Sequence, residues 1–198
     1  MDKVKLNDFC DIMNGHSFRG KIKPIEDGNV SVIQLSDINE LQGIDFNNLV
    51  RTRFEPKKED VFLKKGDVLC VSKGPRLYAI CLGEVPEKTL ASFHMSVIRV
   101  SKDNILPEFV SWHLNNSQKY FLRNSQGGSG VTHMSKSKLE ELPVALPSIE
   151  AQETIKKLEI LKKKEKKIMK RLGSLREVIT LEYQKALASQ KIKNCKEK

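Results

Sequence analysis

The sequence predicts an α+β protein in which residues 1–147 form a mixed β-sheet domain with packed helices. Residues 148–198 are predicted to form one long coiled-coil α-helix that ends in a frayed basic tail. Three observations lead to this fold class. Short β-branched runs alternate with turn residues in roughly the first half of the chain. A helical period begins at Pro107, and a seven-residue apolar repeat follows Pro147.

Four runs are predicted to be strands of one sheet. Each is short, rich in Val, Ile and Leu, and close to a turn signal such as Asp27-Gly28 or Gly74-Pro75. The runs are residues 30–35, 68–72, 77–82 and 96–100. Residues 51–60 show no clean period, so we expect a loop or a broken helix there.

One amphipathic helix is predicted to begin at Pro107, a residue suited to the first turn of a helix. Its apolar arc holds Phe109, Val110, His113, Leu114, Ser117, Tyr120 and Phe121. Because His113 lies within that arc, a hydrogen-bonded core histidine is favoured over a metal ligand. Trp112 falls off the arc, and it is expected either as a surface anchor or beneath a neighbouring loop.

The segment ahead of the long helix carries several signals that shape the backbone. Ser137 and Glu140 have the spacing of a capping box, which predicts a single helical turn with Ser137 as its N-cap. Pro143 and Pro147 bracket a short extended piece. Ser148 is then predicted to cap the next helix, with Glu150 near its positive end.

The long helix shows a heptad repeat whose core positions are mostly apolar. The apolar members of this seam are Leu158, Leu161, Ile168, Leu172, Leu175, Ile179 and Ala186. Gly173-Ser174 allows a helical hairpin to be considered, since glycine inside a helix costs about 1 kcal/mol relative to alanine. The heptad phase passes through Gly173 unbroken, which favours one continuous helix with a seam that another helix must cover.

Charge and composition divide the chain into a nearly neutral body and a basic tail. Residues 1–150 hold 20 Lys and Arg against 19 Asp and Glu, whereas residues 151–198 hold 15 against 6. Neither a signal peptide nor a membrane span is apparent, so a soluble, cytoplasmic protein without membrane contact is expected. The lysines run around the helix, which favours a solvated helix with some DNA or acidic-partner contact over a dedicated groove binder.

No motif for catalysis, metal or cofactor binding stands out. The four cysteines show no CxxC pairing and the four histidines are scattered, which favours reduced thiols in a cytosolic core. The glycines of residues 127–130 lead to His133, where a dinucleotide-binding loop needs its third glycine. We therefore expect a non-enzymatic binding protein without a cofactor.

Five segments of the chain follow one another in a recognisable order. The most specific is LPVALPSIEAQETI at residues 142–155, directly ahead of the long helix, and the other four are residues 5–15, 32–38, 63–69 and 95–99. In their order and spacing these segments resemble the specificity subunit of type I restriction-modification enzymes, and the resemblance covers about residues 4–190.

This resemblance implies a target recognition domain that reads double-stranded DNA, and a helix that spaces two such domains and docks the methyltransferase and restriction subunits. A complete subunit resembles this arrangement written twice, so a half-length form is expected here. Such a form should pair its seam in an antiparallel homodimer and place two identical domains on a bipartite palindrome.

Candidate DNA contacts are chosen on physical grounds, since Lys and Arg bind phosphates and polar side chains read bases. Lys73 and Arg76 are the favoured pair, because they flank a Gly-Pro turn between two predicted strands. Two further loops contribute Arg19, Lys21 and Lys23, and Arg123, Gln126, Ser129 and His133. The alternative for each loop is a solvated surface without a DNA contact.

Two other functions are compatible with the sequence. One is a coiled-coil interaction protein whose body does not bind DNA. The other is the specificity fragment of a fused methylase-nuclease, although Met1 directly before the first family segment argues against it. Salt-dependent retention on DNA separates the first from a specificity subunit.

Overall fold

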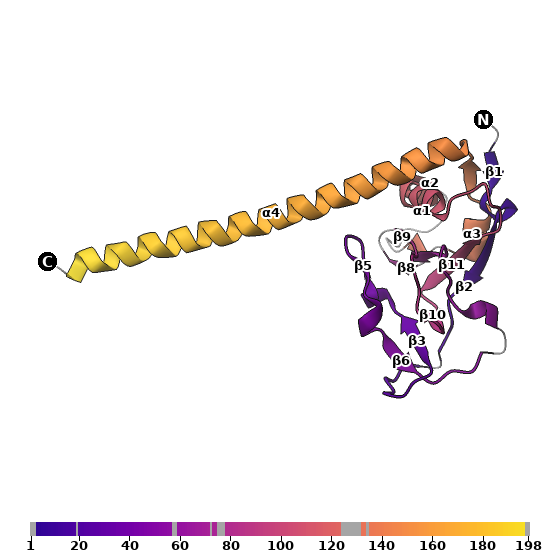
Figure 1. Cartoon of the computed structure of the whole chain (residues 1–198), viewed down its shortest axis with the longest axis horizontal. Helices are drawn as coiled ribbons and strands as arrows, with labels where there is room; N and C mark the ends of the chain where they lie inside the picture. Colours follow the sequence, from indigo (N-terminus) through magenta and orange to yellow (C-terminus); the bar gives the residue numbers. More distant parts are fainter. Residues whose placement is uncertain are drawn as a thin grey trace. The chain divides into compact units, whose positions relative to one another are not determined.

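The structure of the chain is a computed structural model that describes residues 3–18, 20–56, 59–71, 73–74, 78–123, 132–133 and 135–196. Side chains at 59, 73–74, 121–123, 132–133 and 190–196 lie outside that description. The chain divides into two compact units, Met1–Lys157 and Leu158–Lys198. The expected α+β fold class is confirmed, since several sheets precede one long C-terminal helix (Figure 1).

An antiparallel four-stranded sheet forms the centre of the first unit. Its order is β2 (Cys10–Asn14), β11 (Met95–Val100), β7 (Val68–Val71) and β9 (Tyr78–Cys81). Three of the four predicted runs are therefore strands of one sheet. The central position Ile98 pairs with Ile12 on one side and Val68 on the other, and all three side chains are buried.

The fourth predicted run belongs to a different sheet, which corrects the expectation of a single one. β3 (Val30–Ile33) pairs in parallel with β10 (Thr89–Ala91) and antiparallel with β6 (Val50–Thr52). Arg51 and Thr52 thus lie in a strand, although residues 51–60 had been expected as loop or broken helix. The β3 and β10 segments are far apart in the sequence, so this pairing leaves no local periodic signal.

The single amphipathic helix expected after Pro107 is two helices, α1 (Pro107–Asn116) and α2 (Gln118–Arg123). Ser117 separates them. Its hydroxyl donates to the carbonyl oxygen of His113 at 2.7 Å, and its N–H donates to that of Leu114 at 3.0 Å. A serine whose side chain bonds to the preceding turn favours a helix end over a helix interior, and this explains the interruption.

Polar side chains on α1 tie it to strand β9. Asn115 accepts from the Ala79 N–H at 2.8 Å and donates to the Ala79 carbonyl at 2.9 Å. Ser111 donates to the same carbonyl at 3.0 Å. Between these bonds, the apolar face of α1 buries Phe109 and Leu114 in the core.

The chain closes the first unit with a short helix and a strand. β13 (Pro143–Ala145) pairs antiparallel with β1 (Lys3–Lys5), so the extended piece between the prolines is confirmed. Helix α3 (Lys136–Glu140) is capped by Ser135, whose hydroxyl accepts from the Lys138 N–H at 3.4 Å. The expected N-cap, Ser137, was wrong by two residues because both serines offer the same capping chemistry.

The remaining short elements in the described residues are two strand pairs and four 3-10 turns. Two further two-residue strand pairs are β4 (Ile38–Asn39) with β5 (Gly43–Ile44) and β8 (Lys73–Gly74) with β12 (Thr132–His133). Four 3-10 turns are η1 (Leu6–Asp8), η2 (Leu35–Asp37), η3 (Phe46–Asn48) and η4 (Glu59–Val61).

Helix α4 (Ile149–Lys196) is continuous through Gly173, as the unbroken heptad phase predicted. Ser148 accepts from the Ala151 N–H at 3.4 Å, and this bond confirms it as the cap. The pKa of Glu150 is lowered, mainly by its hydrogen bond to Ser148, as expected for an acid at a helix N-terminus.

Gln152 anchors the first turns of α4 in the first unit. Its buried amide accepts from the Leu106 N–H at 2.9 Å and donates to the carbonyls of Asn104 at 3.2 Å and Pro147 at 3.1 Å. Nearby, Lys156 forms an ion pair with Glu108 at 2.9 Å. The first two turns of the helix therefore belong to the core of the body.

Candidate nucleic-acid interface

Two of the loops predicted to contact DNA come together in the fold. Strand β8 contains Lys73 and strand β12 contains His133, and these two residues are direct partners in the antiparallel ladder. Thr132 pairs with Gly74 in the same way. Residues 73–74 and 132–133, some 60 residues apart in the sequence, thus share one two-stranded ribbon. A two-stranded ribbon is one of the shapes that the major groove of B-DNA admits.

The other predicted contacts are distributed between described and undescribed parts of the chain. Arg19, Arg76, Gln126 and Ser129 lie outside the described residues. Arg123 is the last residue of α2, and like Lys73 and His133 it is described by its backbone alone. Lys21 and Lys23 are exposed, and Lys21 lines a hollow.

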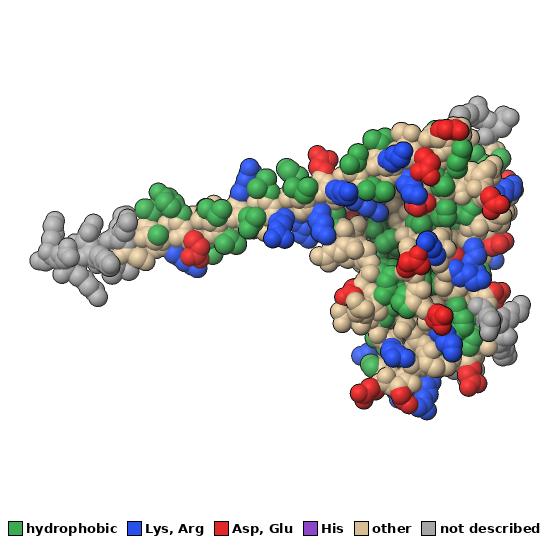
Figure 2. Space-filling model, viewed as in Figure 1, with side chains coloured by type: hydrophobic (Ala, Val, Ile, Leu, Met, Phe, Trp, Pro, Cys, Tyr) green, Lys and Arg blue, Asp and Glu red, His purple; other side chains and the backbone are tan. Residues whose placement is uncertain are grey.

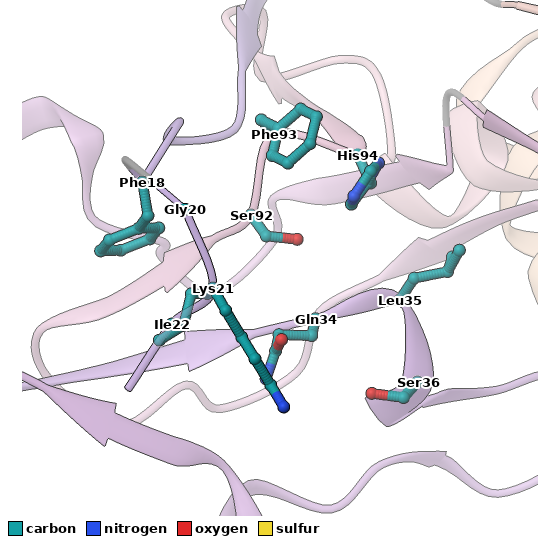
Figure 3. A pocket seen from close by; sticks show the side chains of 10 residues that line it. All are labelled: Phe18, Gly20, Lys21, Ile22, Gln34, Leu35, Ser36, Ser92, Phe93 and His94. Atoms are coloured by element: carbon teal, nitrogen blue, oxygen red, sulfur yellow. The ribbon is translucent and has the colours of Figure 1, made fainter. Parts of the chain in front are cut away.

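This hollow has a volume of about 330 Å³ and is formed by three separate stretches of chain (Figure 3). Its lining residues are Phe18, Gly20, Lys21, Ile22, Gln34, Leu35, Ser36, Ser92, Phe93 and His94. The three stretches follow β2, β3 and β10 respectively. The hollow is therefore built where the two main sheets of the body meet.

Backbone hydrogen bonds fix the floor of the hollow around Ser92. The Ser92 N–H donates to the Ile33 carbonyl at 2.9 Å, and the Ser92 carbonyl accepts from the Met95 N–H at 3.1 Å. On the other side, Gly15 donates to the Met95 carbonyl at 2.8 Å. A Cβ on Gly15 would lie 2.1 Å from the Ser92 carbonyl oxygen, so only glycine permits this approach.

Aromatic rings stand on two sides of the hollow. The Phe18 ring packs edge-on against His16 with their centroids 4.6 Å apart, and Phe54 lies 4.2 Å from the same histidine. On the other side, the rings of Phe93 and His94 lie 3.8 Å apart. In Figure 3, Ser92 appears between Phe18 and the Phe93–His94 pair, while Gln34 and Lys21 lie below, with the Lys21 nitrogen at the end farther from Ser92. Sequence reasoning did not identify these residues except Lys21, since no motif spacing links them.

Groups that could do chemistry by themselves are held in structural roles. His113 is half-buried with its Nε2 atom 3.1 Å from the Pro143 carbonyl, and burial lowers its pKa, so the expected core histidine is confirmed. Trp112 is partly buried and packs against the main core near Phe109. Burial raises the pKa of both Cys10 and Cys70 to about 12.

Two kinds of feature are absent from the described residues. No group of three or more His, Cys, Asp or Glu side chains in the described part of the chain could hold a metal ion. Among the helices described, none is long and apolar enough to cross a membrane.

The distal part of α4, beyond Lys157, exposes most of its large apolar side chains. Every predicted seam residue is exposed. At 3.6 residues per turn, Met169, Tyr183 and Leu187 fall on the same arc as the seam, which spans about a third of the circumference. We call this arc the apolar stripe. Figure 2 shows hydrophobic side chains along α4 up to the residues drawn in grey.

Charge is unevenly distributed along the same helix. Residues 162–171 carry seven Lys and Arg and one Glu, whereas residues 172–189 carry two of each sign. Figure 2 shows most of the blue side chains of α4 in the half nearer its N-terminus. Between residues 162 and 189 the helix is therefore basic in its first part and neutral in its second.

The family model described as "Type I restriction modification DNA specificity domain" matches residues 1–186. The solved HsdS subunit from Thermoanaerobacter tengcongensis is similar with a TM-score of 0.58 and 17% identity, over 83% of this chain and 37% of that one. The S subunit of a type I restriction-modification system from M. genitalium gives a TM-score of 0.50 and 13% identity, over 79% and 37%.

A third structure, from work on complex assembly and conformational transition of the type I R-M system, has a TM-score of 0.57 and 18% identity. It covers 85% of this chain and 40% of its own. The chain thus spans less than half the length of each of these proteins, and at such identities the likeness concerns the fold.

Proposed function

The chain belongs to the family of type I restriction-modification DNA specificity domains, and from this premise we propose that it is a sequence-specific DNA-binding specificity subunit of a type I restriction-modification system. It directs methyltransferase and restriction subunits to a bipartite DNA site and carries no catalysis itself. The match to the family model over residues 1–186 is the observation that carries this proposal.

The β8–β12 ribbon is the first part of the proposed DNA surface. It joins residues from two of the three candidate loops, including the favoured Lys73, and its ladder puts Lys73 beside His133. Lysine supplies phosphate contact, and histidine adds a polar group beside it. The body as a whole is almost neutral, so its affinity for DNA relies on local positive charge at such loops and on the partner subunits.

The apolar stripe of α4 is the proposed dimer contact. A long helix with an exposed apolar face gains most of its stability from packing against another helix. An antiparallel partner would place the basic residues 162–171 of one copy beside the neutral residues 172–189 of the other. A parallel partner would place residues 162–171 of the two copies side by side. Repulsion between these like charges therefore favours the antiparallel homodimer.

The DNA-binding proposal is tested by measuring affinity for mixed-sequence duplex at several salt concentrations. The full chain should bind with a steep salt dependence. Replacing Lys73 and Arg76 together by alanine should lower the slope of log affinity against log salt by about 2, if both contact phosphate. Lys3→Ala with Lys102→Ala removes the same charge from residues outside the three predicted loops and is the matched control.

If the slope of log affinity against log salt were unchanged in the Lys73–Arg76 variant, the ribbon would not be part of the DNA-binding surface. Absence of any salt-dependent binding by the parent chain would instead favour a coiled-coil protein without DNA contact. For the partner subunits, co-expression with a type I methyltransferase should give copurification and adenine methylation at a bipartite palindrome. Two unlike half-sites, with no second specificity chain present, would contradict the homodimer.

A further inference from the structure

The hydroxyl group of Ser92 is a buried polar group whose hydrogen-bonding capacity is unused. Ser92 is 3% exposed, and its Oγ is the single buried side-chain nitrogen or oxygen without a hydrogen-bond partner in the described part of the chain. Buried hydroxyl groups in folded proteins nearly always have a partner. The Ser92 N–H and carbonyl already bond to Ile33 and Met95, so only the hydroxyl has capacity left for a further partner such as water or a ligand.

The adjoining hollow is where such a partner can enter. Ser92 lines it, and Figure 3 shows the Ser92 side chain directed into the space among the labelled side chains. At about 330 Å³ the hollow lies at the small end of the range for ligand sites, about 300–1,000 Å³. It therefore suits one small, flat group better than a peptide or a helix.

The composition of the lining indicates the chemistry of that group. Phe18 on one side, and Phe93 with His94 on the other, present aromatic surfaces. Gln34 and Ser36 provide both donors and acceptors next to Ser92, and Lys21 adds a positive charge. Aromatic rings for stacking, an amide for a polar edge and a cation for phosphate are the elements by which proteins hold an unstacked nucleotide.

The concave shape also decides between two ways of contacting DNA. Base edges in the grooves of a duplex are read by protein parts that protrude, such as a helix or a ribbon. A hollow instead receives something that protrudes from the DNA. Resting on the proposed DNA-binding function, we propose that this hollow binds a single nucleobase that has left the stack, with Ser92 and Gln34 bonding its edge.

Sequence-independent DNA probes test this proposal without knowledge of the target site. Two duplexes are compared, one fully paired and one with a single bulged 5-iododeoxyuridine. The full chain should bind the bulged duplex about ten-fold more tightly, the effect of one base stacked on an aromatic side chain. Irradiation should attach the bulged base to the peptide that carries Phe18 or to the one that carries Phe93 and His94.

Two variants separate a role in binding from a role in folding. Phe93→Ala should abolish the preference for the bulge and the crosslink while leaving affinity for the paired duplex unchanged. Val61→Ala is the matched control, since Val61 is a comparably exposed apolar residue outside the hollow. Ser92→Ala should weaken bulge binding without lowering the melting temperature, because the hydroxyl makes no bond to any residue that the structure describes.

The outcomes keep the two proposals apart. Tight, salt-dependent binding of both duplexes with no preference and no crosslink at the hollow would overturn the nucleobase site and leave DNA binding intact. Failure to bind either duplex would overturn the DNA-binding function itself. Free deoxynucleoside monophosphates are titrated in parallel. Binding of these that Phe93→Ala abolishes, without a preference for the bulge, would overturn the proposal for an extruded DNA base and assign the hollow to a free nucleotide.

Discussion

The body and the distal part of α4, beyond Lys157, place the same kinds of apolar residue in opposite environments. Leu139 and Leu142 are buried among side chains from η1, β2 and α1, whereas Leu158 and Leu161 face outward along the helix. Hydrophobic stabilisation depends on area removed from water, so the body obtains it within one chain. The distal helix obtains it only when another helix covers it. The stability of the body should be independent of protein concentration. The stability of the distal helix should increase with protein concentration.

The largest effect is expected in the body, at the pair between Arg99 and Asp67. Arg99 donates to both Asp67 carboxylate oxygens at 2.7 Å, and Asp67 is 1% exposed. Arg99→Leu leaves that carboxylate buried without its cation. Because the Arg99 side chain is partly exposed, we expect a loss of about 3 kcal/mol in unfolding free energy, at the low end for a broken buried pair.

Urea unfolding followed by tryptophan fluorescence measures this loss, and it should be the same at low and high protein concentration. Arg53→Ala breaks a highly exposed ion pair with Asp27 and should cost at most about 1 kcal/mol. Equal losses in the two variants would contradict the contrast between a buried and an exposed pair.

The second effect concerns the distal helix alone. Leu175 and Leu181 are 50% and 51% exposed, but only Leu175 lies on the apolar stripe. Leu175→Glu should weaken dimerisation at least about 100-fold, because the twofold axis puts two charges in the contact. Leu181→Glu makes the same chemical change off the stripe and should leave the dimer intact.

Light scattering at micromolar concentration measures the mass of each variant. Urea unfolding of the body should be unaltered in both, which separates the two regions directly. A parent chain that is monomeric at this concentration would contradict the dimer, and equal behaviour of the two variants would contradict the stripe.

A third change tests where the two regions meet along α4. Gln152→Glu removes both donors that face the Asn104 and Pro147 carbonyls, and it introduces a buried charge. Unsatisfied buried groups of this kind predict a loss of about 2 kcal/mol in unfolding free energy. The reverse change one residue later, Glu153→Gln, should have little effect in the same urea titration. A concentration-dependent loss for Gln152→Glu would place this residue with the distal helix instead of the body.

The smallest expected effect is a pH dependence in the body. Burial lowers the pKa of folded His113 below its unfolded value of about 6.5. Between these two pKa values the unfolded chain binds more protons, so unfolding free energy rises with pH in that window. The contribution is complete above about pH 6.5 and is lost as pH falls through the folded pKa.

Unfolding free energies of the parent and of His113→Gln are measured from about pH 5 to about pH 8. Above about pH 6.5 the two curves should have the same slope, and below it the parent's curve should fall more steeply as pH is lowered. Parallel curves throughout would contradict the burial of neutral His113.

Local signals predicted well those parts of the fold whose determinants are local. The capping of α4 by Ser148 and its continuity through Gly173 follow from neighbouring residues or from periodicity. The division of strands between two sheets does not, because the partners of β3 lie far along the chain. Likewise, Ser135 and Ser137 have equal chemistry as helix caps, and only the packing of Leu139 in the core distinguishes them.

The candidate site shows the same division. Lys21 was identified from charge beside a flexible glycine, which is a local property. Gln34, Ser92 and Phe93 come from segments that meet only in the folded chain, so no spacing relates them. Gly15 is required for a structural reason, since its close approach to Ser92 excludes any side chain. In a single sequence, however, nothing distinguishes this glycine from the others.

The bonds between Asn115 and strand β9 also affect how copies of the chain meet. β9 is the outer strand of its sheet, and the exposed rim of a sheet is a template for strands of other molecules. Asn115 occupies both backbone groups of Ala79, as a neighbouring strand would. An intruding strand would have to displace this side chain and, with it, part of α1. Growth of the sheet into larger aggregates is thereby opposed at β9.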